Sequence, residues 1–166
     1  DNPHDKLQAS MSTLIITNHV KDGVTLAKKH RLPKEIINII AEHHGDTAVM
    51  YFYHKAKNED KSIDVKIEDF RYKGPKPQTR EAAIIMLADS TEAAVRSIKD
   101  PTKKNIEEMI RNIIKGKLED GQLQECDLTL KDLNTIANAF SSIVMGIFHE
   151  RIEYPNLDLE KEKGEL

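Results

Sequence analysis

The amino-acid sequence predicts an all-α domain of six or seven helices. Apolar residues recur at helical spacing in several long segments, and no segment keeps the alternation of a β-strand over its length. At 166 residues the chain has the length of one domain with a single substantial core. A hydrophobic content of 39% and a charged content of 32% are typical of helices that each expose one face to water.

The first half of the chain is expected to hold short helices. Apolar residues at helical spacing predict a helix over residues 6–19, which Asp22-Gly23 ends before a further short helix to about residue 30. Leu32-Pro33 begins the next helix, because proline is favoured in a first helical turn. The residues that mark the first of these helices are Leu7, Met11, Leu14 and Ile15.

A fourth short helix is expected to open at Tyr51-Phe52-Tyr53. The charged run 55–61 that follows is expected to be a solvated loop.

The second half is expected to hold the central helix and two long amphipathic ones. The segment 81–95 is apolar nearly all round, which indicates a central position, and Thr79 is a candidate N-cap. The next helix has an apolar stripe and ends at Gly121. That stripe comprises Ile106, Met109, Ile110, Ile113, Ile114 and Leu118.

The last helix is expected to run from about Leu130 to Ile152, and Pro155 closes it. The charged segment 156–166 has few apolar residues and is expected to be a disordered tail. The folded domain is therefore predicted over residues 1–155.

Charge and cysteine content narrow the function classes. A net charge of −3 gives no reason to expect a nucleic-acid polymer as partner. Cys126 is the only cysteine, so the chain can form no internal disulfide, and a reducing compartment is expected. No apolar run is long enough to cross a membrane, and nothing resembles a signal peptide. The chain opens at Asp1 without a methionine, which is expected of a piece of a larger protein.

His43 and His44 are the first candidates for chemistry. Ile36, Ile39, Ile40 and His43 share one stripe of a helix, which is expected to be buried. Imidazole nitrogens that face a core need partners, and divalent metal ions provide them well.

Asp89 and His19 extend this candidate site. Asp89 lies in the middle of the most apolar helix, where an ionised carboxylate is costly unless it is paired or bound to metal. His19 lies four residues after Ile15 and is expected on the same apolar face. Mixed nitrogen and oxygen ligands suit iron, manganese or zinc. The residues alone leave other interpretations open: His19 as a satisfied core residue, and Asp89 as a helix cap or a partner of Arg96.

A basic segment, residues 71–80, leads into the helix that carries Asp89. It holds four cations and no acid, and both guanidinium groups and helix N-termini favour phosphate. Arg96 lies two turns beyond Asp89 on one helical face, where it is expected either to bind a phosphate or to neutralise an acid. The candidate phosphate-binding residues are Lys76, Thr79, Arg80 and Arg96; the alternative for the segment is a solvated loop.

Six short motifs occur in one order along the chain. They are Asn18-His19-Val20-Lys21-Asp22-Gly23, Glu42-His43-His44-Gly45, Lys76-Pro77-Gln78-Thr79-Arg80-Glu81-Ala82-Ala83, Leu87-Ala88-Asp89-Ser90, Glu119-Asp120-Gly121-Gln122-Leu123 and Cys126-Asp127-Leu128-Thr129. In this order they resemble the C-terminal HD domain of the seven-transmembrane HD receptors, a family of bacterial membrane phosphodiesterases that hydrolyse cyclic di-AMP. The resemblance extends to about Pro155.

The resemblance implies a metal-dependent phosphodiesterase that converts cyclic di-AMP to linear pApA with a metal-activated hydroxide. It places His19, His43, His44 and Asp89 among the catalytic ligands of two divalent ions, iron or manganese. The family has further ligands, including a His-Asp dipeptide on an upstream helix. This chain lacks that helix, and its His4-Asp5 resembles the segment that follows the helix in the family. The chain is therefore expected to be an HD-domain helical bundle truncated at its N-terminus, with incomplete metal ligation.

The same resemblance implies a cytoplasmic domain of a bacterial membrane protein, joined to the membrane only through upstream segments. The exposed stripes of the two C-terminal helices are candidates for contacts in a homodimer. Two alternative functions remain open: a non-catalytic module that senses a nucleotide, and an HD hydrolase of another nucleotide such as a dNTP or guanosine tetraphosphate.

Overall fold

The computed structural model describes residues 8–59, 65–99 and 101–149. Six α-helices and one short 3-10 helix account for most of these residues, and the part that is described contains no β-strand, which agrees with the predicted all-α class. The helices are α1 (Ala9–Lys29), α2 (Lys34–Glu42), α3 (Met50–Glu59), η2 (Ile67–Phe70), α4 (Arg80–Val95), α5 (Lys103–Glu119) and α6 (Leu130–His149). In this described part, no helix is both long and apolar enough to cross a lipid bilayer.

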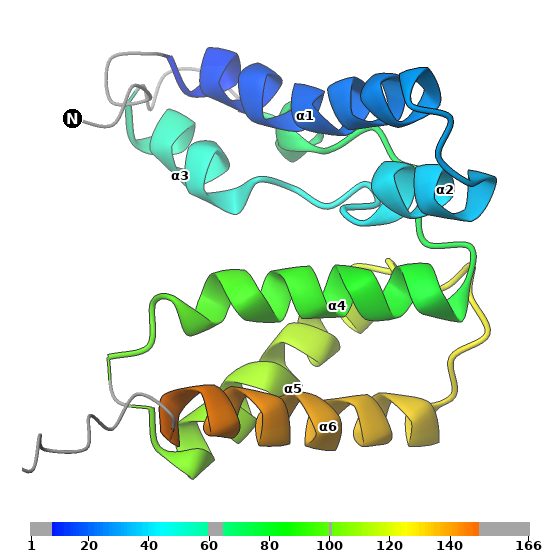
Figure 1. Cartoon of the computed structure of the whole chain (residues 1–166). Coiled ribbons are helices and arrows are strands. Elements are labelled where there is room, and N and C mark those ends of the chain that lie inside the picture. Colours follow the sequence, from blue (N-terminus) through cyan, green and yellow to red (C-terminus); the bar gives the residue numbers. More distant parts are fainter. Residues whose placement is uncertain (1–7, 60–64, 100, 150–166) are drawn as a thin grey trace, which may run out of the picture.

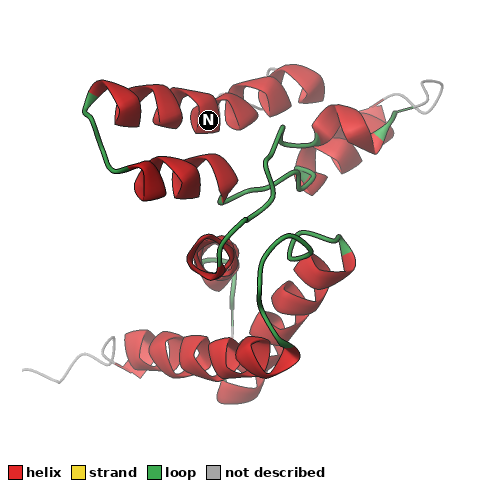
Figure 2. Ribbon diagram, turned by 90° about the vertical axis from the view of Figure 1, so that its right-hand side faces the viewer, coloured by secondary structure: helices red, strands yellow, loops and turns green. Residues whose placement is uncertain are grey.

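Helix α4 lies in the middle of the molecule. Helices α1, α2 and α3 lie on one side of it, and α5 and α6 lie on the other (Figures 1 and 2). Its central position was predicted from the apolar residues around its circumference, and Ala82, Ala83, Met86 and Leu87 are fully buried. The Thr79 side chain accepts a hydrogen bond from the backbone N–H of Ala82, which confirms the predicted N-cap.

The main core lies between α4, α5 and α6. From α5, the predicted stripe contributes Ile106, Ile110 and Ile114, while Leu118 near its end is exposed. Leu133, Ile136 and other residues of α6 complete this cluster, against which Cys126 also packs. Helix α5 ends at Glu119, and Asp120 and Gly121 follow, which agrees with the predicted end of this helix at Gly121. Gly121 has a φ of 70°, in the left-handed region that glycine favours.

Three predictions for the first half were wrong. The helix α1 runs unbroken through Asp22-Gly23, because a glycine costs a helix interior only about 1 kcal/mol. A Cβ atom at Gly23 would lie 3.0 Å from the Ile40 side chain, so this glycine lets α1 and α2 approach closely. The charged residues Lys55 to Glu59 are helical and not a loop, and Lys55 pairs with Glu59 one turn later.

The expected apolar face of α1 is the third error. Met11, Leu14 and Ile15 are exposed, and small residues of α1 are buried in their place. Those buried residues are Ala9, Ser12, Thr13 and Ala27. The isoleucine stripe of α2 is likewise only half-buried, and Ile36 is exposed.

Several predictions lie outside the described residues. These are His4-Asp5, residues 60–61 of the charged run, the end of the last helix at Ile152 and Pro155, and the tail 156–166.

Candidate metal centre

His43 and His44 form the turn that follows α2. The helix ends at Glu42, and Gly45 has a φ of 54°, a left-handed conformation in which a side chain would be strained. A Cβ atom at Gly45 would also overlap with the side-chain oxygen of Gln122. Gly45 therefore allows the chain to turn sharply and presents both imidazoles toward α1.

Three histidines gather at this turn. One ring nitrogen from each of His19, His43 and His44 lies within 4.8 Å of the others. The Nε2 atoms of His19 and His43 are 3.3 Å apart. All three residues were candidates from the sequence, and the fold places them together. They are less buried than expected, because His19 is exposed and the other two are half-buried.

Backbone carbonyls set the tautomer of two of these rings. The Nδ1 atom of His19 lies 2.6 Å from the carbonyl oxygen of Ile16, and that of His43 lies 2.8 Å from the carbonyl oxygen of Ile40. Because a carbonyl oxygen only accepts, each Nδ1 donates, and in the neutral form of each ring Nε2 then keeps a free lone pair. Two lone pairs at 3.3 Å repel unless a cation lies between or beside them, so the donor set fits a divalent metal ion.

Asp89 reaches the same site from α4. Its Oδ2 atom lies 3.7 Å from Nδ1 of His44. The expectation that Asp89 is buried was wrong, because its side chain is 46% exposed and lies on the side of α4 that faces the histidines. A carboxylate that is partly hydrated and beside imidazoles costs less free energy than one in the core, and remains available as a ligand.

Tyr72 was missed by the sequence analysis. Its ring stacks on His44 with a centroid distance of 4.3 Å and an interplanar angle of 26°. Backbone hydrogen bonds hold it there, because the Tyr72 N–H donates to Thr47 and the Val49 N–H donates to Phe70. Burial and the Asp89 carboxylate raise the pKa of Tyr72 to about 12, so its hydroxyl stays protonated at neutral pH.

Lys117 on α5 was also missed. Lys117 lies three residues after buried Ile114, at the edge of the apolar stripe, and this position could have indicated that its side chain is partly buried. Burial lowers the pKa of Lys117, against the opposing effect of Asp120 and Asp89. Burial also lowers the pKa of His44 to about 3, with His43, His19 and Lys117 contributing, so His44 is neutral and able to ligate a metal at physiological pH.

A polar network fixes the histidine turn to the loop after α5. The side chain of Gln122 is completely buried; it donates to Asp46 at 2.6 Å and to Asp120 at 2.8 Å, and accepts from the Asp46 N–H. Arg71 donates to both Asp120 carboxylate oxygens and to the Asp46 carbonyl oxygen. Glu42 is buried and accepts from the Gln78 N–H, which joins α2 to the start of α4.

Three of the four candidate phosphate-binding residues have protein partners. Thr79 caps α4, and Arg80 donates to the Asp127 carbonyl oxygen at 2.6 Å. Arg96 pairs with Glu92 at 2.6 Å, and its side chain is 76% exposed. Lys76 is half-buried in the loop before α4. The fold therefore gives Thr79, Arg80 and Arg96 local structural contacts, which account for these residues without a ligand.

Comparisons with known proteins agree with the predicted resemblance. The HD domain family matches residues 1–94. The chain is 51% identical, over 93% of its length, to the cyclic-di-AMP phosphodiesterase PgpH of Bacillus subtilis, and 48% identical over the same share to PgpH of Listeria monocytogenes. It spans about a fifth of the length of these curated relatives, 22% and 21% respectively.

A solved structure gives the same relationship. The HD domain of Listeria monocytogenes PgpH, crystallised in complex with cyclic di-AMP, superposes with a TM-score of 0.86 at 48% identity. The match covers 92% of this chain and 71% of that domain. The family match, the identity and the shared fold lead to one conclusion: this chain belongs to the HD-domain family.

Proposed function

We propose that the chain is the catalytic HD domain of a metal-dependent phosphodiesterase that hydrolyses cyclic di-AMP to linear pApA. The observation that carries this proposal is the pair of His19 and His43 Nε2 atoms, 3.3 Å apart, with both Nδ1 atoms committed to backbone carbonyls. The 48% identity to a domain crystallised with cyclic di-AMP supports the choice of substrate.

His19, His43, His44 and Asp89 would hold divalent ions, for which we propose iron or manganese. Such an ion supplies Lewis acidity and lowers the pKa of a water molecule toward neutrality. The chain orients the ligands in advance: carbonyl oxygens of Ile16 and Ile40 fix two rings, and stacking on Tyr72 fixes the plane of His44.

The reaction adds one water molecule across a phosphodiester bond. The water oxygen bonds to phosphorus, the bond from phosphorus to the leaving ribose oxygen breaks, and that oxygen takes up a proton. Cationic residues near the site would offset the charge that develops on the phosphoryl oxygens. Lys76 is the candidate from the basic segment whose ammonium is least committed to protein contacts, and we retain Arg80, Thr79 and Arg96 as weaker candidates.

We further propose that the site is completed by ligands from segments upstream of these residues, in a longer bacterial membrane protein. The relatives' much greater length supports this proposal. The solved HD domain also extends beyond the matched region. The domain would then lie on the cytoplasmic side, and the exposed apolar residues Ile143 and Ile147 of α6 are candidates for contacts between two copies.

A substrate panel tests the proposed function. The natural protein that carries this chain, purified without chelator and supplied with Mn²⁺, should convert cyclic di-AMP to pApA. It should show lower kcat/KM for cyclic di-GMP, a dNTP and guanosine tetraphosphate. Turnover of one of the other nucleotides alone would identify a different HD hydrolase, and binding of cyclic di-AMP without any turnover would identify a sensory module.

Two substitutions test the site. His43→Ala and Asp89→Ala should each abolish hydrolysis while the fold is retained, because both side chains lie at a partly exposed site outside the core. His30→Ala is the matched control, since His30 is exposed at the end of α1, away from the cluster. Full activity in either of the first two variants would refute the assignment.

A further inference from the structure

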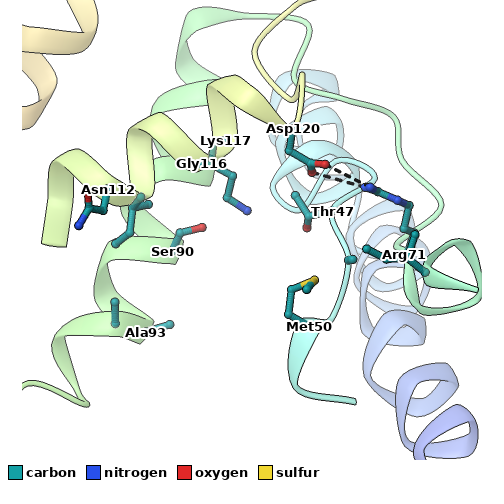
Figure 3. A pocket seen from close by; sticks show the side chains of 13 residues that line it. Thr47, Met50, Arg71, Ser90, Ala93, Asn112, Gly116, Lys117 and Asp120 are labelled. Carbon is teal, nitrogen blue, oxygen red and sulfur yellow. Dashed lines mark hydrogen bonds and ion pairs between the residues drawn. The ribbon is translucent and has the colours of Figure 1, made fainter. Parts of the chain in front are cut away.

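A cavity of about 810 Å³ lies between the start of α3 and the helices α4 and α5 (Figure 3). Its lining includes Thr47, Arg71 and Ser90. These residues are close neighbours in sequence of His44, Tyr72 and Asp89, respectively, so the cavity adjoins the candidate metal centre. The Thr47 hydroxyl donates to the His44 carbonyl oxygen at 2.8 Å, which fixes this wall of the cavity to the histidine turn.

The Lys117 side chain extends from α5 into this cavity (Figure 3). Its ammonium group is close enough to His44 and Asp89 to interact with both electrostatically. Lys117 is half-buried, whereas Lys115, two residues earlier on the same helix, has a side chain that is 70% exposed. A cation that is withdrawn from water in this way loses hydration that only an acceptor can replace.

No such acceptor is present among the described residues. Lys117 donates no hydrogen bond and forms no ion pair there, whereas the other cation of the cavity, Arg71, is paired with Asp120 at 3.1 Å. Asp120 already accepts hydrogen bonds from Arg71 and Gln122, so it does not need Lys117 as a partner. Among the described residues, the Lys117 ammonium is therefore a cation of the cavity that has no hydrogen-bond or ion-pair partner.

We propose that Lys117 is a substrate-positioning residue that binds a phosphate oxygen of the nucleotide in this cavity. The inference rests on the proposed function and adds to it a residue outside the metal-ligand set. An ammonium is a compact point charge that pairs well with a phosphate oxygen in a site of low dielectric constant. Ser90 and Asn112, which also line the cavity, offer neutral hydrogen-bonding groups to the ribose or base of the same ligand.

The variants that test this role are Lys117→Met, which keeps the length of the side chain and removes the charge, and Lys117→Arg, which keeps the charge. Lys115→Met is the matched control, because Lys115 lies on the same helix and pairs with Glu119 at the surface. Each is made in the natural protein that carries this chain, with Mn²⁺, and four quantities are measured: KM and kcat for cyclic di-AMP, bound manganese, and Tm.

Lys117→Met should raise KM about 10- to 100-fold, the effect of losing one charge-assisted hydrogen bond. Its manganese content and Tm should equal those of the wild type, because Lys117 is neither a ligand nor a member of an ion pair. Lys117→Arg should recover most of the loss, and Lys115→Met should behave as the wild type.

An unchanged KM in Lys117→Met would overturn the inference. So would a fall in manganese content or Tm that accounts for the loss, because Lys117 would then be structural. The wild-type measurement distinguishes this failure from a failure of the proposed function. If the wild type turns over cyclic di-AMP and Lys117→Met has the same KM, only the role of Lys117 is refuted. A wild type that neither binds nor cleaves cyclic di-AMP refutes the proposed function itself.

Discussion

The two sides of α4 bury their apolar residues to different extents. On the side of α5 and α6, large aliphatic residues such as Ile106 and Ile110 are completely buried in one cluster. On the side of α1, α2 and α3, the buried cluster is small, and Leu14 and Ile15 are 58% and 50% exposed. The candidate metal centre lies on this second side, near α4.

This difference indicates that one side of α4 mainly stabilises the fold and the other mainly forms the candidate site. The α4–α6 side supplies most of the hydrophobic free energy of folding and holds α4 in place. The α1–α3 side is held instead by close approach at small residues and by the polar network of Gln122, Asp120 and Arg71. Substitutions should therefore act mainly on stability on the first side and mainly on the site on the second.

The largest effect on stability is expected for Ile110→Ala on α5. Ile110 is completely buried in the main cluster, so the substitution leaves a cavity and should lower the free energy of unfolding by about 2–5 kcal/mol. Urea denaturation followed by circular dichroism measures this change. A loss below 1 kcal/mol, roughly that of a surface substitution, would mean that the α4–α6 side is not the main core.

An intermediate effect is expected for Gln122→Ala, which breaks the connection between the two sides. Loss of this amide leaves the Asp46 N–H and carboxylate without their partner, which should cost about 1–3 kcal/mol. It should also weaken manganese binding, because the His43-His44 turn is then less firmly held. Exposed Gln124 provides the control Gln124→Ala, and equal manganese affinity in the two variants would exclude a positioning role for Gln122.

A smaller effect is expected from the pH dependence of the ion pair between Arg71 and Asp120. Although burial opposes it, hydrogen bonds from Arg71 and Gln122 hold the pKa of Asp120 below its ordinary value of 3.8. Since the folded state binds this proton less readily than the unfolded chain, the ionised carboxylate stabilises the fold above pH 3.8. That stabilisation is lost as the pH falls through the folded-state pKa.

The comparison of wild type with Asp120→Asn measures this contribution. The difference in the free energy of unfolding between the two proteins should be constant from about pH 5 to about pH 7, where the Asp120 carboxylate is ionised in both the folded and the unfolded state. The difference should shrink below pH 3.8. A difference that grows toward acid would contradict the assigned direction of the shift.

The smallest effect is expected for Leu14→Ala on α1. Because more than half of this side chain is exposed, the free energy of unfolding should change by no more than about 0.5 kcal/mol. The same denaturation experiment as for Ile110→Ala gives the value. A loss as large as that of Ile110→Ala would show that the apolar face of α1 is covered in solution.

The sequence predicted best where burial alone decides the structure. The stripe of α5, the central position of α4 and the Thr79 cap follow from periodicity and capping, which are local properties. Gly23 was misread as a helix end because its role is to admit Ile40 from another helix, which no local pattern contains.

The candidate site was predictable only in part, because local patterns indicate some of its residues and tertiary contacts bring in the others. His43 and His44 stand out as a pair, whereas Tyr72 and Lys117 reach the site only through tertiary contacts of the loop before α4 and of α5. The sequence also led to the wrong prediction that Asp89 is buried. Apolar residues lie nearly all round this helix, so the sequence pattern does not indicate which side of it faces a polar site.

The central proposal is that His19, His43 and His44 hold a divalent metal ion for phosphodiester hydrolysis. Its most direct test is the metal content, by mass spectrometry, of the natural protein that carries this chain and of its His43→Ala and His30→Ala variants, all purified without chelator. The account predicts bound iron or manganese in the wild type and in His30→Ala, and a loss of this metal in His43→Ala. Equal metal content in all three proteins, or none in any of them, would contradict it.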